Sequence, residues 1–211
     1  MMDRSSRFIS LSGLSGVSAG VCALIGTGLA YPYVYGGKQY IINLDTAISQ
    51  QLRNDSAIIF NTWLFWIAIG TFFAALVSAL FFTFLKSKKL RIPIWGTVAR
   101  RLLISVSIPI ITGGIFLYAL LGNSGPFFFN IGLIAPGCLL FYGLALINAS
   151  KYTLAEIKYL GYIQLLLGFI NLFFIGYGLY FWAFGFGIMH IFYGLYMWNK
   201  YDRQNPAGSY E

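Results

Sequence analysis

The stretch LGYIQLLLGFINLFFIGYGLYFWAFGFGIMHIFYGLYMW, residues 160–198, contains no Asp, Glu, Lys or Arg. Its thirty-nine residues are enough for two helical crossings of a bilayer, because a helix rises about 1.5 Å per residue and the hydrocarbon core is about 30 Å thick. The GYG at Gly176 to Gly178 predicts a turn in the middle of the stretch. The stretch therefore predicts a hairpin of two transmembrane helices, at about 160–177 and 180–198.

The composition of the whole chain agrees with a membrane protein. Its 211 residues are 58% hydrophobic and 9% charged, with a mean hydropathy of +0.73. Soluble domains are about 45–50% apolar and ~25% charged, so a water-soluble core is excluded. Further spans are predicted at about 8–31, 57–85, 102–121 and 127–148. The predicted fold is an all-α bundle of six transmembrane helices in a single membrane domain, residues 1–211.

The positive charges predict the orientation of this bundle. Twelve of the fourteen Lys and Arg residues fall in alternate gaps between the apolar stretches, and only Lys38 and Arg53 lie in the other gaps. Lys and Arg are enriched on the cytoplasmic side of membrane proteins. We therefore expect both termini in the cytoplasm, with residues 199–211 as a flexible cytoplasmic tail. A cleaved signal peptide is the alternative interpretation of the first apolar stretch, since a basic head precedes it.

The densest basic run is KSKKLRIPIWGTVARR, residues 86–101, which contains no acidic residue. Cations beside a span attract anionic lipid headgroups, and an acidic partner surface is the alternative. Nucleic acid is not expected as a partner, because the charge lies beside apolar spans rather than on a folded polar surface. The predicted lipid contacts are Lys86, Lys88, Lys89, Arg91, Arg100 and Arg101.

The long gap from Pro32 to Ser56 lies on the side that carries few cations. Ile41, Leu44 or Asp45, Ile48 and Leu52 recur in it at near-helical spacing. This spacing predicts a short amphipathic helix on the outer membrane surface. A mobile loop with incidental periodicity is the alternative.

A few polar residues inside the predicted spans are the candidates for a site. All six acidic residues lie in tails or loops, and His190 is the only histidine. An ionisable residue inside a membrane is a candidate functional residue. Counting from the ends of the last two spans predicts that Asn171 and His190 lie level and hydrogen-bond, with Gln164 on the same face as Asn171. These residues form either a ligand site or a structural link between helices.

Other residues inside the spans point to helix geometry. Pro109 and Pro136 predict kinks in the third and fourth spans, either simple bends or the broken helices that line transporter sites. Ser12, Gly16 and Gly20 repeat every four residues, which predicts a face where another helix packs closely.

No cofactor or metal is expected. The chain has no cluster of His, Cys, Asp and Glu with metal-ligand spacing. A membrane haem usually takes two histidines, and the chain has one. The two cysteines lie inside apolar spans, where a cysteine usually behaves as a small hydrophobic residue.

Both ends of the chain carry a family resemblance. The segments MDRSSRFISLSGLSGVSAG, from Met2, and WAFGFGIMHIFYGLYMWNKYD, from Trp182, resemble an uncharacterised family of multi-span inner-membrane proteins of Bacteroidetes-type bacteria. The resemblance implies a bacterial inner membrane. It implies no activity, substrate or catalytic residue.

Three functions remain open. The leading hypothesis is a non-enzymatic binding, sensor or accessory module for a lipid-like or small apolar ligand or for another membrane protein, including a second copy of the chain. The first alternative is a small transporter or channel with its polar site at Gln164, Asn171 and His190. The second is a membrane-embedded enzyme. A water-filled crevice at these residues favours transport, whereas dry, packed surroundings favour the binding module.

Overall fold

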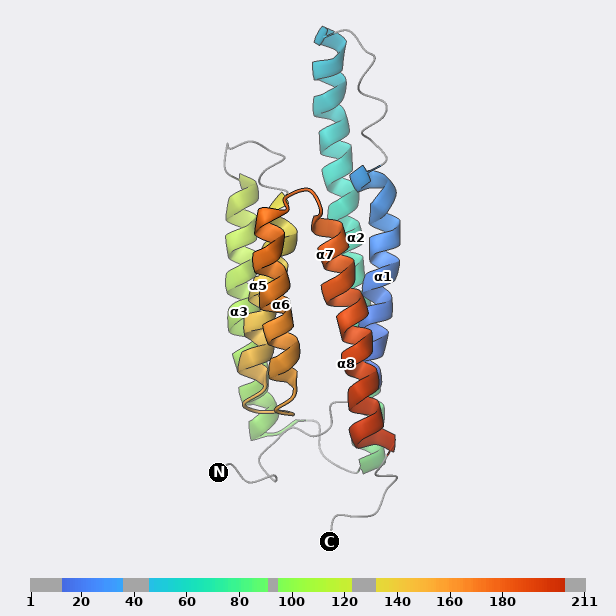
Figure 1. The fold of residues 1–211 in the computed structure, drawn as a ribbon, viewed down its shortest axis with the longest axis vertical. Coiled ribbons are helices and arrows are strands. Elements are labelled where there is room, and N and C mark those ends of the chain that lie inside the picture. The colour runs from blue at the N-terminus through green and yellow to red at the C-terminus, as the bar shows by residue number, and fades with distance from the viewer. Residues whose placement is uncertain (1–12, 36–45, 91–94, 123–131, 204–211) are drawn as a thin grey trace.

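The computed structural model describes residues 13–35, 46–90, 95–122 and 132–203 (Figure 1). The regular elements among these residues are all helices, with no strand, so the predicted all-α class is confirmed. The last four of the elements named in the next sentence follow one another without a break and form a single helix. The elements are α1 (Gly13–Tyr35), α2 (Thr46–Leu90), α3 (Thr97–Gly122), α5 (Ile134–Ala149), α6 (Ile157–Phe173), α7 (Gly178–Trp182), η3 (Ala183–Met189), α8 (His190–Met197) and η4 (Trp198–Arg203).

Four helices in the described part are long and apolar enough to cross a membrane: α1, the part of α2 from Trp63 to Lys89, the part of α3 from Thr97 to Leu120, and Gly178–Tyr201. The remaining two, α5 and α6, have 16 and 17 residues. At about 1.5 Å per residue, each falls short of a hydrocarbon core of about 30 Å. The structure is therefore that of a helical membrane protein with four helices of spanning length.

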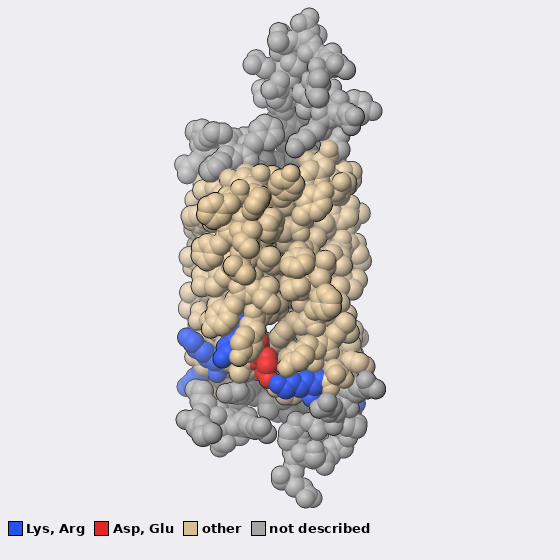
Figure 2. Space-filling model, viewed as in Figure 1, with Lys and Arg blue, Asp and Glu red and all other residues tan. Residues whose placement is uncertain are grey.

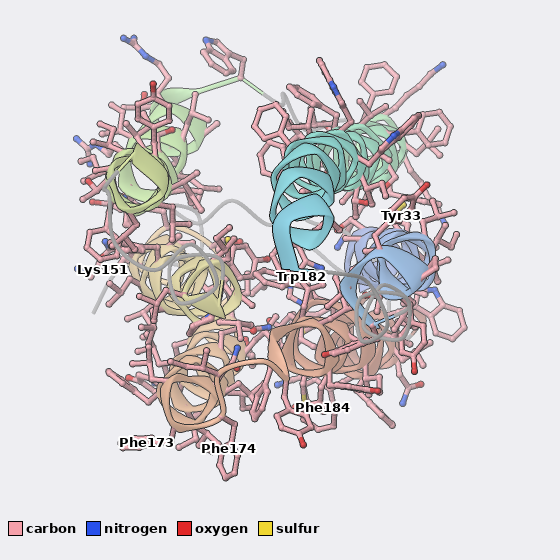
Figure 3. The ribbon with its side chains drawn as sticks, turned by 90° about the horizontal axis from the view of Figure 1, so that it is seen from above. Tyr33, Lys151, Phe173, Phe174, Trp182 and Phe184 are labelled. Atoms are coloured by element: carbon pink, nitrogen blue, oxygen red, sulfur yellow. The ribbon has the colours of Figure 1, made fainter. Side chains whose placement is uncertain are left out.

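The helices form two groups that meet at the last helix, α7 to η4. On one side α1 packs against η3 and α8, and α2 packs on the outside of α1. On the other side α5 packs against α6, and α3 packs on the outside of α5. Seen from above, the last helix lies between α6 and α1, with α2 and α3 at the two edges (Figure 3). Between Trp63 and Lys89 the side chains of α2 are exposed or half-buried except at Thr83 and Ser87, which suits a helix that faces lipid over most of its surface.

Glycines bring the paired helices into close contact. A Cβ added to Gly16 would lie 3.1 Å from Gly194 Cα, and one added to Gly20 would lie 2.7 Å from Gly187 O. At the α5–α6 contact, a Cβ on Gly143 would lie 2.8 Å from Gly161 O. Small residues of this kind let helix backbones approach closely in membranes. The core of the bundle is therefore a pair of glycine-lined contacts.

The structure corrects one predicted element. The expected separate surface helix in the gap from Pro32 to Ser56 is wrong, because α2 runs as one helix from Thr46 to Leu90. Its 45 residues span about 68 Å at 1.5 Å per residue. Figure 1 shows α2 extending beyond the other helices. The residues 36–45 of that gap lie outside the described part.

The two ends of the bundle differ in chemistry. The described Lys and Arg side chains gather at the end where α2 and α5 finish and α3 and α6 begin (Figure 2). The opposite end holds tyrosines: Tyr35 contacts Tyr31 and Tyr180, each with ring centroids 5.2 Å apart. Tyr35 Oη also donates a hydrogen bond to Gly176 O, 3.0 Å away. This contact ties the end of α1 to the turn between α6 and α7, where Gly176 takes a positive φ of 104°.

Candidate functional site

His190 is the first residue of α8 and is buried, with 6% of its surface exposed. Its Nδ1 lies 2.9 Å from Gly185 O and its Nε2 lies 2.7 Å from Tyr142 Oη. A carbonyl oxygen only accepts hydrogen bonds, so Nδ1 carries the proton and Nε2 accepts from the Tyr142 hydroxyl. Both nitrogens of the neutral ring are therefore occupied, and the contact joins α5 to α8.

Gly185 lies in a π-helical segment, η3, which runs from Ala183 to Met189. Short π-helical turns often occur at functional sites. The Gly185 carbonyl accepts from the His190 ring five residues later and also from Gln164 Nε2 on α6, at 2.8 Å. A Cβ on Gly185 would lie 2.6 Å from Gln164 Oε1. A glycine at this position therefore lets the Gln164 side chain lie directly against the backbone of η3.

Aromatic rings surround the polar contact. Phe186 lies between Trp182 and His190, with ring centroids 4.6 Å and 6.0 Å away. The Tyr142 ring centroid lies 5.1 Å from that of Phe186. These rings keep the His190–Tyr142 hydrogen bond in apolar surroundings, where such a bond is not weakened by competing water.

The predicted hydrogen bond between Asn171 and His190 is wrong. Asn171 lies near the end of α6, two residues before Phe173, and its Nδ2 lies 3.9 Å from the position of a Cβ on Gly178. Neither side-chain atom of Asn171 has a hydrogen-bond partner. The α6–α7 turn is tight, so antiparallel pairing places Asn171 opposite Gly178 and Gln164 opposite Gly185. His190 therefore lies further from the turn than the count from the span ends predicted.

The prolines do not form a shared site. Pro109 lies inside α3, which continues as one helix through it. Pro136 is the third residue of α5, and the Gly137 amide bonds back to Leu133 O at 3.0 Å. A proline is tolerated in the first turn because the amide hydrogen that it lacks would have no partner in the helix. Pro136 thus lies in the first turn of α5, just after the turn at Leu133 and the helical residue Gly132, and the residues before Gly132 lie outside the described part.

The other predicted residues lie away from this polar cluster. Gly16 and Gly20 lie on the α1 face that meets α8 and η3, and Ser12 is outside the described residues. Arg91 is also outside them, while the rest of the predicted lipid contacts lie at the basic end, on α2 and α3. In the parts of the chain that the structure describes, no three His, Cys, Asp or Glu side chains gather into a possible metal site.

At the basic end, Glu156 connects the α5–α6 loop to the last helix. Its Oε1 accepts hydrogen bonds from Lys200 Nζ at 2.7 Å and from Tyr201 Oη at 2.6 Å. Burial acts to raise the pKa of Glu156, but these two hydrogen bonds and the Lys200 charge outweigh it, so its pKa lies below the usual value. The carboxylate is therefore ionised at neutral pH and fixes the loop to η4.

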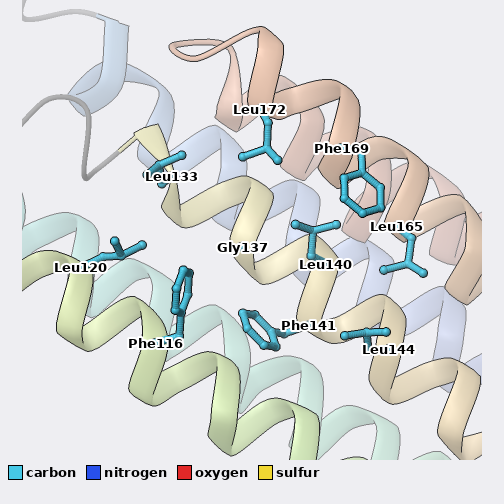
Figure 4. Close-up of a pocket in the computed structure, with 10 residues that line it drawn as sticks. All are labelled: Phe116, Leu120, Leu133, Gly137, Leu140, Phe141, Leu144, Leu165, Phe169 and Leu172. Carbon is cyan, nitrogen blue, oxygen red and sulfur yellow. The ribbon is translucent and has the colours of Figure 1, made fainter.

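A second candidate site is an apolar groove between α3, α5 and α6, with a volume of about 510 Å³ (Figure 4). Its lining residues are all apolar: Phe116, Leu120, Leu133, Gly137, Leu140, Phe141, Leu144, Leu165, Phe169 and Leu172. Ligand pockets commonly measure ~300–1,000 Å³ and are mostly apolar. On α6 the groove residues Leu165, Phe169 and Leu172 lie between about a quarter turn and nearly half a turn around the helix from Gln164 and Asn171. The groove and the polar cluster are therefore separate sites.

Two features of these sites were missed by the sequence interpretation. Tyr142 supplies the hydroxyl that binds His190, and the apolar groove forms on the opposite side of α5. A hydroxyl in the middle of the run LLFYGLAL was the available signal for Tyr142. The groove had no signal, because its residues do not differ from those of any apolar span.

The chain matches no family model, no curated protein and no solved structure.

Proposed function

We propose that the protein is a non-enzymatic binding module of a bacterial inner membrane, acting as a sensor or accessory subunit, and that it holds a hydrocarbon chain of a lipid-like molecule. The observation that carries this proposal is the groove of about 510 Å³ lined entirely by apolar side chains. Such a lining offers no partner for a polar headgroup, so it selects the hydrocarbon part of its ligand.

The position of the groove supports a chain that lies along the membrane normal. Its lining on α5 extends from Leu133 to Leu144, eleven residues or about 16 Å along the helix axis. This half of the bundle is the one away from the basic end. If cations mark the cytoplasmic side, the bound chain belongs to the outer leaflet.

The same charge distribution supports six crossings with both termini in the cytoplasm. The α5–α6 connection carries Lys151 and the first turn of α6 carries Lys158, both at the basic end, and the α6–α7 turn lies at the uncharged end. Lys88, Lys89, Arg100 and Arg101 on α2 and α3 would then lie level with anionic headgroups of the inner leaflet, which attract basic residues.

The polar cluster gives less support to the two alternatives. Gln164 and Asn171 have no exposed surface and His190 has 6%, which fits a packed link between helices better than a transport pathway. A catalytic base must lie within hydrogen-bond reach of its substrate, and a substrate would have to displace Gly185 or Tyr142 to reach a ring nitrogen of His190. Both nitrogens of His190 are engaged by Gly185 and Tyr142.

A lipid analogue with a diazirine in its acyl chain tests the proposal on the whole protein in liposomes. We expect cross-links in the groove, at residues such as Phe169 and Leu144. Leu172→Trp adds bulk to the groove wall and should reduce these cross-links several-fold. Leu166→Trp is the matched control on the same helix, because Leu166 is 60% exposed and is not part of the lining. It should leave the cross-links unchanged.

A different distribution of cross-links would contradict the proposal. Cross-links spread evenly over α2, α3 and the groove, with the same yield in Leu172→Trp and Leu166→Trp, would mean that the groove holds only ordinary surrounding lipid.

A further inference from the structure

Asn171 is the most isolated polar side chain in the described part of the bundle. It has no exposed surface, and neither its Nδ2 nor its Oδ1 has a hydrogen-bond partner. Buried amides in proteins are nearly always paired with protein groups or with ordered water. We therefore expect this side chain to bind a ligand.

The surroundings of Asn171 are three helix ends. Asn171 projects from the last turn of α6. Gly178, at the start of α7, lies close to it: a Cβ added to Gly178 would lie 3.9 Å from Asn171 Nδ2. The same Cβ would lie 2.9 Å from Ala135 Cβ, near the start of α5. The groove of the proposed function lies on another face of α6 and of α5. The site at Asn171 is thus independent of the apolar ligand.

The nearest polar side chains of the cluster are not available to Asn171. Gln164 Nε2 donates to Gly185 O, and although its Oε1 has no partner, Gln164 lies seven residues earlier on α6, about 10.5 Å along the axis and out of hydrogen-bond reach. The two ring nitrogens of His190 are engaged by Gly185 and Tyr142.

The chemistry of the unmet atoms identifies the class of ligand. The Nδ2 group needs an acceptor and Oδ1 needs a donor, so the ligand must do both. An anion would leave Oδ1 without a donor, and a cation would leave Nδ2 without an acceptor. The nearest charged residue on α6 is Lys158, thirteen residues or about 20 Å away along the axis, so no nearby charge on that helix would balance an ion.

We infer that a buried water molecule binds Asn171 between the start of α5, the end of α6 and the start of α7. The water accepts a hydrogen bond from Nδ2 or donates one to Oδ1. If a single water cannot reach both atoms, a second water binds the other one. Internal waters typically make two to four hydrogen bonds to groups that the protein leaves unpaired. This water links the two helices of the hairpin close to their turn.

Water-to-protein NMR on the full chain tests the inference. The protein carries ¹⁵N,¹³C-labelled asparagine and is held in deuterated detergent, and the side-chain amide of Asn171 is assigned through its own backbone. We expect cross-peaks to water with opposite signs in NOE and ROE experiments, the signature of a bound water rather than of proton exchange. Asn148, half-buried at the basic end, serves as the comparison for exchange with bulk water.

Two outcomes would overturn the inference. One is an Asn171 amide without any water cross-peak, and the other is an amide whose close contacts are the polar protons of another side chain. In Asn171→Leu the water cross-peaks should disappear from this region. The wild-type measurement decides the question even where that variant fails to fold.

Discussion

Tyr142 Oη and His190 Nε2 lie 2.7 Å apart and join the two halves of the bundle, since α5 belongs to the α3–α5–α6 group and α8 packs against α1. The Nδ1 of the same ring binds Gly185 O. His190 therefore holds its own helix and α5 in a fixed relation.

Tyr142→Phe removes the donor to His190 and leaves Nε2 unpaired in an apolar environment. We expect the free energy of unfolding to fall by about 0.6 kcal/mol, the average for hydrogen bonds between membrane helices, and by no more than about 1.7 kcal/mol, the largest such value. Steric trapping in bicelles measures this change. Tyr162→Phe on α6 is the control, because Tyr162 is 52% exposed and its loss should change stability little.

His190→Phe tests the same contact from the other side. Because the two residues share one hydrogen bond, the double variant should lose less stability than the sum of the single variants. Strict additivity would contradict a direct interaction.

Gly185→Ala places a Cβ 2.6 Å from both Gln164 Oε1 and Leu139 Cδ2. The side chain of Gln164 must then move and its hydrogen bond to Gly185 O must weaken. Overpacking of this kind costs about 1–3 kcal/mol, measured as the shift in thermal unfolding or in steric trapping. Gly114→Ala on α3, where an added Cβ meets nothing within 4 Å, should leave stability unchanged or raise it.

The proposed orientation predicts which cysteines can be labelled in intact cells. Tyr177→Cys, at an exposed position beside the uncharged turn, should react with a membrane-impermeant maleimide from outside. Lys151→Cys, at the basic end, should react only after the membrane is permeabilised. The native Cys22 and Cys138 are half-buried and are replaced by serine for the measurement. The reverse labelling pattern would contradict cytoplasmic termini.

The lowered pKa of Glu156 predicts a dependence of stability on pH. A carboxyl whose pKa is lower in the folded protein than in the unfolded one stabilises the fold above its unfolded pKa, and this contribution is lost as pH falls through the folded pKa. Wild-type stability should therefore decline as pH is lowered below the usual carboxyl pKa. The Glu156→Gln variant should be less stable than the wild type at neutral pH, and its free energy of unfolding should change less with pH over that acidic range. Unfolding measured at several pH values tests both.

The all-helical class and the hairpin of the last two helices could be predicted because they depend on long uncharged stretches. The GYG signal placed the hairpin turn correctly, at the residues between Phe173 and Gly178. Helix ends were less predictable. The second helix begins at Thr46 rather than near residue 57, because polar residues outside a bilayer can continue a helix as well as end one.

The contacts between polar side chains could not be predicted from depth alone. The Asn171–His190 prediction counted residues from the ends of uncharged stretches, which do not coincide with the ends of α6 and α7. The true register follows from close glycine contacts, such as Gly185 against Gln164. Tyr142 was overlooked because a tyrosine within an apolar span resembles its phenylalanine neighbours.

The π-helical segment from Ala183 to Met189 sets how the two faces of the last helix are aligned with each other. Gly185 meets Gln164 of α6, whereas Gly194, nine residues later, meets Gly13 and Val17 of α1. Each residue of an α-helix turns the chain by about 100°. A π-helical turn holds more residues than an α-helical one, so this segment takes up a residue that would otherwise turn the rest of the helix by that angle, and it keeps Gly185 on α6 and Gly194 on α1 at the same time.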